Sequence, residues 1–178
     1  MELINGLFPR YDEKGRLLIK AAYDIAEKAL KDHKRSNGVP FIEHPIAVAK
    51  IACDEIGLSA ECIAAVFLHE ATRFFPETDI TSVKFGNDVY TIVDGLNKIS
   101  TIKPKDTRLE AENYKKLIVS YSKDPRVTVL KIADRLEVMR SLDMFPKLSI
   151  SSGTTMKLSG CFDSVISYAN HCAQVQVT

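Results

Sequence analysis

The segment from Ala60 to Phe74 limits the fold more than any other part of the sequence. Its residues are apolar on most of a helical circumference, and Ser59 stands where a helix N-cap is favoured. A helix of this kind is stable only when other elements cover it on most sides. We therefore predict a central, buried helix in which His69 and Glu70 are buried as well.

Other segments carry apolar residues at helical spacing and can supply this cover. A long amphipathic helix is predicted from Arg16 to His33, before the turn SNGVP at 36–40. A second helix is predicted from Pro45, which suits a first turn, until Gly57 ends it. The remaining predicted helices are a short one capped by Thr78 or Asp79 and ending before FGN at 85–87, and longer ones over 89–99, 108–121, Pro125 to Leu142, and 158–173.

One stretch allows a strand as an alternative. The run RVTVL at 126–130 is rich in β-branched residues, which is typical of strands. Its spacing of three and four nevertheless continues through IADRLEVMRSL, which favours a helix. The polar stretches 100–107 and 149–155 are predicted to be a loop and a linker. Because no segment requires a sheet, the predicted fold class is all-α.

Length and charge narrow the class of protein further. A chain of 178 residues fits a single domain, predicted here over 1–178. The longest uncharged apolar stretch, Cys62 to Leu68, is too short to span a membrane, and no signal-like pattern begins the chain, so we expect a cytoplasmic protein. A net charge of +1 gives no field for nucleic acid or a membrane surface, and cysteine spacing gives no zinc motif. An anionic ligand must therefore be held locally.

Four residues are candidates for a metal site: His44, His69, Glu70 and Asp134. Asp134 stands inside an apolar helical pattern, and a buried carboxylate requires a partner. Imidazoles and carboxylates together suit Mn²⁺, Fe²⁺ or Zn²⁺. The alternative for each residue taken singly is an ordinary buried polar group paired within the protein.

Five blocks of sequence, taken in their order along the chain, support the hypothesis of a metal site. The blocks are RSNGVPFIEHPIAVAKI at 35–51, AAVFLHE at 64–70, FGNDVYTIVDGLNKIS at 85–100, ENYKKL at 112–117 and DPRVTVLKIADRLEVMRSL at 124–142. In this order and at this spacing, over about 21–142, they resemble the hydrolase domain of the RelA/SpoT homologue family. The tail segment DSVISYAN at 163–170 resembles the family's next helix only faintly.

This resemblance implies an HD-type helical bundle that binds one metal ion, usually Mn²⁺. It implies hydrolysis of the 3′-pyrophosphate of guanosine tetra- and pentaphosphate, and an adjoining synthetase domain or a second copy of the chain as partner. Carried over by position, the metal ligands are His44, His69, Glu70 and Asp134. The nucleotide-side positions are a guanine-stacking Arg35, its neighbour Ser36, and Asn113 and Lys116 on the helix that shapes the pocket.

The chain also departs from the family pattern. The family's His-Asp pair is here His69-Glu70, one methylene longer. The Glu-Asp pair that follows it, which positions or deprotonates water in the resembled enzymes, is replaced by Arg73 and Phe74. Ser36 replaces a lysine, and Glu137-Val138 replaces a dipeptide that carries a nucleotide-side asparagine.

Arg73 lies three residues after Glu70 and thus on the same helix face. At about 6 Å from a divalent ion and an effective dielectric near 20, its charge opposes binding by roughly 5 kcal/mol before relaxation. We expect Arg73 to pair with Glu70, and with Asp134, in place of a metal, which leaves the site empty. The alternative is that Arg73 turns to solvent and a weakened metal site persists.

These residues support a pyrophosphohydrolase-like domain for a guanine-nucleotide alarmone whose activity is weak or lost. One alternative is a non-catalytic module that binds a nucleotide, a partner protein or a synthetase domain. Another is an HD-type phosphohydrolase for a different nucleotide. Stoichiometric Mn²⁺ in the purified protein separates the first reading from the second.

Overall fold

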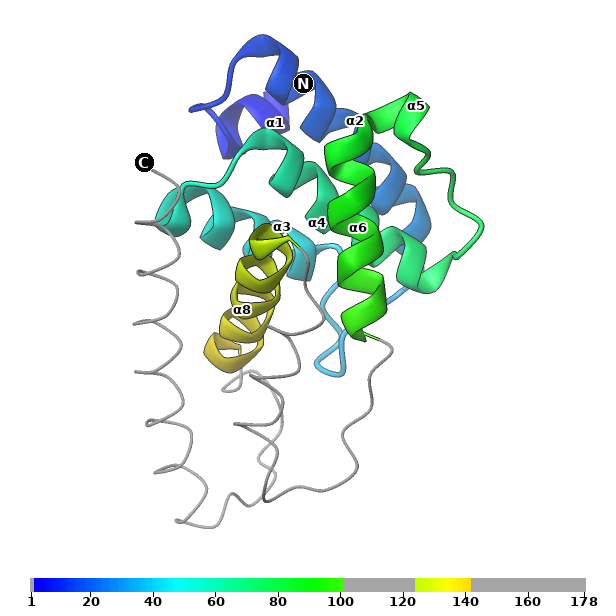
Figure 1. The fold of residues 1–178 in the computed structure, drawn as a ribbon. Coiled ribbons are helices and arrows are strands. Elements are labelled where there is room, and N and C mark those ends of the chain that lie inside the picture. The colour runs from blue at the N-terminus through cyan, green and yellow to red at the C-terminus, as the bar shows by residue number, and fades with distance from the viewer. Residues whose placement is uncertain (1, 101–123, 142–178) are drawn as a thin grey trace.

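The computed structural model describes residues 2–100 and 124–141. Within these ranges it is helical and has no strand, which confirms the predicted all-α class. Its elements, labelled in Figure 1, are α1 (Glu2–Leu7), α2 (Glu13–Leu30), α3 (Glu43–Lys50), the π-helix η1 (Ile51–Ile56), α4 (Ala60–Phe74), α5 (Ser82–Phe85), α6 (Asn87–Ser100) and α8 (Pro125–Arg140).

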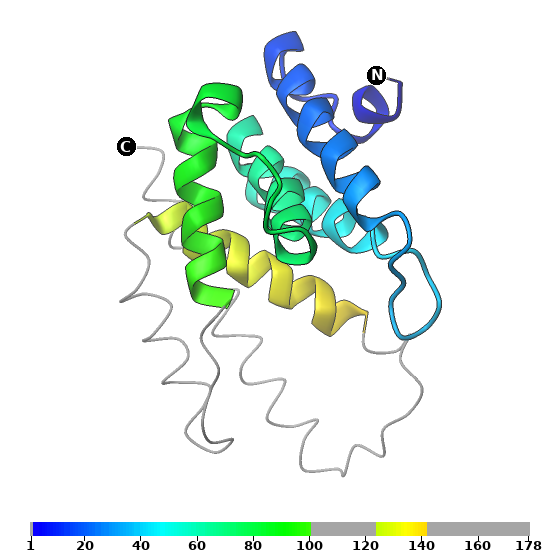
Figure 2. The ribbon, with the colours of Figure 1, turned by 90° about the vertical axis from the view of Figure 1, so that its right-hand side faces the viewer.

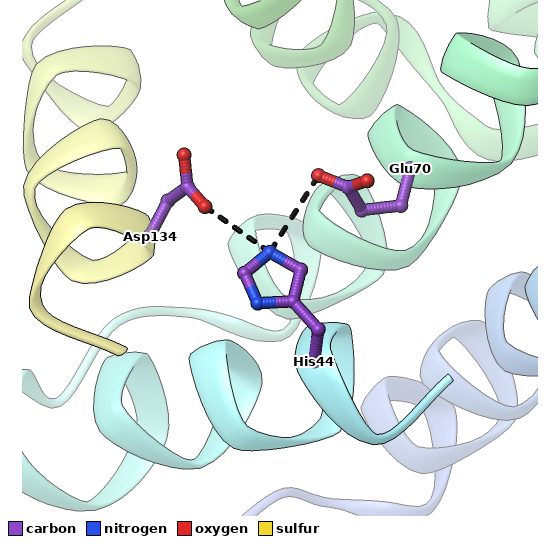
Figure 3. Close-up of side chains that lie close together, drawn as sticks. All are labelled: His44, Glu70 and Asp134. Carbon is purple, nitrogen blue, oxygen red and sulfur yellow. Dashed lines mark ion pairs between the residues drawn. The ribbon is translucent and has the colours of Figure 1, made fainter. Parts of the chain in front are cut away.

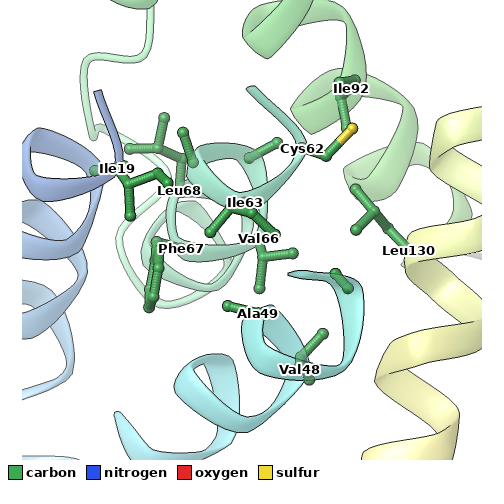
Figure 4. Close-up of a cluster of buried hydrophobic side chains, with 14 of the residues drawn as sticks. Ile19, Val48, Ala49, Cys62, Ile63, Val66, Phe67, Leu68, Ile92 and Leu130 are labelled. Carbon is green, nitrogen blue, oxygen red and sulfur yellow. The ribbon is translucent and has the colours of Figure 1, made fainter. Parts of the chain in front are cut away.

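Helix α4 is the central element, as its composition predicts. It contacts α2, α3, α6 and α8. Figure 2 shows it between α2 and α6, with α8 running beneath them in that view. Its side chains Ile63, Phe67 and Leu68 are fully buried and belong to the same hydrophobic cluster as Ile19 of α2 and Leu130 of α8 (Figure 4). Burial of most of α4 carries His69 and Glu70 into the interior.

The first long helix is shifted from its predicted bounds. Asp12 caps α2 by accepting a hydrogen bond from the backbone of Gly15, so the helix begins at Glu13 and ends at Leu30. A turn follows in which the backbone of Arg35 donates to Val39 at 2.8 Å and Gly38 has a φ of 85°. The short α1 was not predicted, because Glu2–Leu7 is too short for periodicity to be decisive.

The second predicted helix consists of two parts. Helix α3 ends at Lys50 and continues directly as η1, whose wider turns give way at Gly57 with a φ of 82°. Gly57 thus ends the helical stretch as predicted, because a left-handed residue without a Cβ meets little strain there. Periodicity does not reveal the change from α to π, since the apolar pattern continues through both.

The predicted capping of the next helix by Thr78 or Asp79 is wrong. Helix α5 begins only at Ser82. The Thr78 hydroxyl instead donates to the carbonyl of Phe75, and Asp79 accepts from the backbone of Thr81. Both side chains therefore stabilise the turn between α4 and α5 rather than a helix end.

Helices α6 and α8 pack closely beside the centre of the domain. A Cβ added at Gly95 of α6 would meet a methyl of Val127 at 2.7 Å, so the glycine permits the close approach of α8. Asp124 caps α8 by accepting from the backbone of Arg126, and Pro125 occupies the first turn. The helical reading of RVTVL is confirmed.

The predictions of the loop 100–107, the helix 108–121, the linker 149–155 and the helix 158–173 fall almost wholly outside the described residues. So do Asn113 and Lys116. Among the helices that are described, none has the length and apolar character needed to cross a membrane. The described cysteines, Cys53 and Cys62, are buried free thiols in the core.

Candidate metal centre

Three helices bring His44, Glu70 and Asp134 to one point (Figure 3). His44 stands in the first turn of α3, Glu70 near the end of α4, and Asp134 in the middle of α8. The Nε2 atom of His44 lies 3.1 Å from Asp134 Oδ1 and 3.9 Å from Glu70 Oε1. One ligand atom from each residue fits within a span of 4.8 Å.

The spacing of these donor atoms suits a metal ion. Bonds of about 2.0–2.2 Å to one ion place neighbouring ligand atoms roughly 3 to 3.5 Å apart. The three residues line a cavity of about 10 Å³, enough for one ion or one water-sized group. His69 also lines this cavity, and its Nε2 lies 3.8 Å from Glu70 Oε1. The residues present therefore fit a divalent cation, with His69 as an adjacent fourth donor.

Both histidines are held by their far ring nitrogens. His44 Nδ1 lies 2.6 Å from Glu137 Oε2, and His69 Nδ1 lies 2.8 Å from Asn97 Oδ1. An Nδ1–H that donates to an oxygen is usual for metal-binding histidines, because Nε2 is then the nitrogen that faces the ion. Nε2 of His44 lies against the Asp134 carboxylate and carries a proton that metal binding would have to displace. The sequence prediction missed Asn97 altogether and treated Glu137 only as a departure from the family.

Burial and neighbouring charges shift the pKa values of the histidines and carboxylates in the cluster. Burial by itself lowers the pKa of His44, but hydrogen bonds to Asp134 and Glu137 and the charge of Glu70 raise it to about 9. Burial raises the pKa of Asp134, yet the bond to His44 and the charge of Lys131 hold that pKa well below its ordinary value. Burial lowers the pKa of His69, which favours the neutral form that can bind a metal.

Lys131 is a cation of this site that the sequence prediction did not include. Its side chain is 10% exposed, and its Nζ lies 2.8 Å from Asp134 Oδ2 and 3.2 Å from the hydroxyl of Ser100. It stands three residues before Asp134 on α8, which places the two on one helix face. Asp134 thus pairs with Lys131 and His44, and the expected pairing of Asp134 with Arg73 is wrong.

Arg73 lies at the edge of the cluster. Its Nη1 is 3.4 Å from Glu70 Oε2, in the pairing that the sequence analysis expected, although its side chain is 56% exposed. Phe74 points elsewhere, into a ring cluster with His33 and Phe41 at centroid distances of 4.4 and 5.0 Å. The turn that follows Glu70 therefore contributes a half-exposed guanidinium and no carboxylate to this region.

The guanidinium of Arg35, predicted to stack on a guanine, is buried in an ion pair. It is only 8% exposed and forms a two-pronged ion pair with Glu137, with Nη1–Oε1 at 2.7 Å and Nη2–Oε2 at 3.3 Å. The neighbouring Ser36 is exposed in the turn. Arg35 and His44 consequently share one carboxylate, that of Glu137.

A larger cavity of about 390 Å³ opens beside the ion-sized one. His69 lines both cavities, and Arg73 forms part of the wall of the larger one. The other lining residues are Thr72, Pro76, Thr78, Ile80, Asn97 and Ser100. This cavity has the size of a small-ligand site, with polar donors and one cation next to the candidate metal ligands.

A buried cluster of one histidine and two carboxylates between helices is typical of metal-binding all-α domains. Residues 22–152 match the family model described as HD domain, and the chain belongs to that family. Across 150 residues it is 37% identical to a guanosine-3′,5′-bis(diphosphate) 3′-pyrophosphohydrolase from Aquifex aeolicus, covering 82% of this chain and 20% of the relative.

Two further relatives are similar over a comparable share of the chain. One is a bifunctional (p)ppGpp synthase/hydrolase SpoT from Escherichia coli, 35% identical over 79% of this chain and 20% of the relative. The other is a GTP pyrophosphokinase from Streptomyces coelicolor, 33% identical over 80% of this chain and 17% of the relative. These matches confirm the resemblance to the RelA/SpoT homologue family. The chain spans about a fifth of the length of these curated relatives.

Proposed function

We propose that this domain binds a guanosine 3′,5′-bis(diphosphate)-type alarmone and hydrolyses its 3′-pyrophosphate weakly or not at all. The relatives named for this hydrolysis support the substrate class. The observation that carries the proposal has two parts. The candidate metal ligands lie close together, but the helical turn after Glu70 carries Arg73 and Phe74 and no carboxylate that could act as a base.

The candidate ligands for the ion are His44, Glu70 and Asp134, with His69 beside them. We take Mn²⁺ as the ion from the resemblance to the RelA/SpoT homologue family, since imidazole and carboxylate donors suit Mn²⁺, Fe²⁺ and Zn²⁺ alike. When bound, such an ion supplies a Lewis acid for a phosphate oxygen and acidifies water. The protein's own part is to hold both imidazoles beside the cavity, where their Nδ1 atoms contact Glu137 and Asn97.

Slow hydrolysis is expected because the nearby carboxylates are already paired with other side chains. A general base needs an oxygen that is free to take a proton from the attacking water. Among the described residues around the cavity, Glu70 pairs with Arg73, and Asp134 with His44 and Lys131. Glu137 is held by Arg35 and His44. None of the three is placed to serve as that base.

The same arrangement favours binding of an anion. Arg73 lines the 390 Å³ cavity beside the candidate ligands, and its half-exposed guanidinium can contact a phosphate group there. Asn113 and Lys116 join the nucleotide side in this proposal through the family resemblance. A nucleotide-binding module that does not turn over its ligand is therefore the second candidate function.

The decisive test is metal analysis and turnover on one preparation purified without chelator. We expect guanosine tetraphosphate to bind in calorimetry, while pyrophosphate release with Mn²⁺ stays at least about 100-fold below that of an intact relative, the typical worth of a general base. A His44→Gln variant is the control for site-dependent metal. Rapid pyrophosphate release by the unaltered protein would overturn the weak-activity proposal. Absence of alarmone binding would instead favour an interaction module or another nucleotide.

Partners are part of the same proposal. Because one relative is named as a bifunctional synthase/hydrolase and the chain spans about a fifth of it, a synthetase domain is the proposed neighbour of this fold. Alarmone binding at the 390 Å³ cavity would then serve to report nucleotide levels to that neighbour. Binding measured on the isolated chain and on a chain joined to a synthetase domain of the family tests this point.

A further inference from the structure

Glu137 lies at the junction between the two sides of the site. It is 4% exposed and lies on α8, three residues after Asp134. Residues three apart share a helix face, so α8 presents two carboxylates toward His44. Asp134 contacts Nε2 of the ring at 3.1 Å, and Glu137 contacts Nδ1 at 2.6 Å. One helix thus holds opposite edges of the same imidazole.

The acceptor capacity of Glu137 is filled. Oε2 faces His44 Nδ1 and, at 3.3 Å, Arg35 Nη2. Oε1 accepts from Arg35 Nη1 at 2.7 Å and from the Ser141 hydroxyl at 2.7 Å. A carboxylate offers about four acceptor positions, so these contacts fix both oxygens. Its buried charge is compensated by Arg35, and its partners hold its pKa below the ordinary value even though burial raises it.

We propose that Glu137 is a positioning residue that directs His44 Nε2 at the ion and couples this ligand to Arg35. The inference rests on the proposed ion site and goes beyond it, because it assigns a role to a residue that is neither a ligand nor a base. Loss of the contact at Nδ1 would leave the ring held only from its Nε2 edge and would remove the acceptor that fixes the proton on Nδ1.

The coupling to Arg35 follows from the shared carboxylate. Arg35 and His44 both contact Oε2, so a displacement of the guanidinium also alters the group that orients His44. By linkage, a ligand that binds Arg35 changes metal affinity, and the metal changes the affinity for that ligand by the same factor. The buried pair therefore connects Arg35 to the metal side of the site.

The test measures Mn²⁺ affinity by calorimetry for the unaltered chain and for the Glu137→Gln, Glu137→Ala and Arg35→Gln variants. We expect Glu137→Ala to weaken binding about 10- to 100-fold, the usual cost of losing an outer partner of a ligand. Glu137→Gln should weaken it less, because its amide oxygen still accepts from Nδ1–H. Arg35→Gln should weaken it as well, and adding Arg35→Gln to Glu137→Ala should cause no further loss.

The matched control is Glu55→Gln, which breaks an exposed Glu–Arg pair with Arg140 that does not touch His44. Its metal affinity should equal that of the unaltered chain. Thermal unfolding without metal verifies that each variant is folded, and Glu137→Gln, of nearly equal volume, preserves the test if the alanine variant does not fold. Affinity unchanged in a folded Glu137→Ala variant overturns the positioning role while the proposed function stands. If the alanine variant does not fold, unchanged affinity in both Glu137→Gln and Arg35→Gln overturns it. An unaltered chain that binds no Mn²⁺ overturns the positioning role together with the metal part of the proposed function.

Discussion

The His44 side of the site and the Arg73 side differ in how firmly they are held. His44, Asp134 and Glu137 are linked by short contacts between α3 and α8, and His44 and Glu137 are buried. Arg73 lies at the end of α4, is 56% exposed and contacts Glu70 at 3.4 Å. One side can hold an ion, whereas the other lacks the group that would use it to activate water. The contrast teaches that ligand binding and turnover depend on separate residues, which can change independently.

The largest expected effect comes from restoring acids to the weaker side. The triple change Glu70→Asp, Arg73→Glu and Phe74→Asp should raise Mn²⁺-dependent release of pyrophosphate from guanosine tetraphosphate by roughly 10²- to 10⁴-fold, the worth of a general base. The control is Glu70→Asp alone, which adds no base and should leave the rate nearly unchanged. A folded, metal-bound triple variant without turnover would show that the two sides differ in more than the missing base.

Removal of a ligand on the firm side should abolish the ion site. His44→Gln leaves Asp134 and Glu70 without their shared imidazole, so Mn²⁺ affinity should fall by more than about 100-fold, beyond the cost of losing an outer partner. Titration calorimetry measures it. Substitution of His33, which contacts Phe74 and is not a candidate ligand, by Gln is the matched control. Equal Mn²⁺ affinity in the two variants would remove His44 from the ligand set.

Substitution of Asn97 tests whether His69 binds the ion together with the residues of the His44 side. Asn97→Ala removes the acceptor at 2.8 Å from His69 Nδ1, and Mn²⁺ affinity should fall about 10-fold if His69 binds the ion. Lys98→Ala, on the same helix with a side chain 68% exposed, is the control and should have little effect. A loss below twofold for Asn97→Ala would leave the ion to His44, Glu70 and Asp134.

The smallest expected effect is that of Arg73 alone. Arg73→Gln removes a positive charge near the ion and frees Glu70, but exposure screens that charge, so Mn²⁺ affinity should rise only by roughly two- to fivefold. Lys20→Gln, which breaks an exposed pair on α2, is the control. A gain of 100-fold or more would mean that Arg73 by itself empties the site, and the contrast between the two sides would then be mainly electrostatic.

Much of the fold could be predicted because local patterns are strong where burial is extensive. The apolar circumference of Ala60–Phe74 and the spacing after Pro125 identify α4 and α8 correctly. The caps before α5 were wrong because a turn and a helix start use the same side-chain chemistry at Thr78 and Asp79. The change from α3 to η1 could not be predicted, since it leaves the apolar pattern intact.

The sequence by itself determined that the protein is helical, that its central helix buries a histidine and a glutamate, and that no acid follows them in the next turn. Only the tertiary structure decided which groups meet across helices: Glu137 with His44 and Arg35, Asn97 with His69, and Lys131 with Ser100. Periodicity fixes the face on which a side chain lies, whereas its partner depends on how the helices cross, and that is set by packing of the whole core.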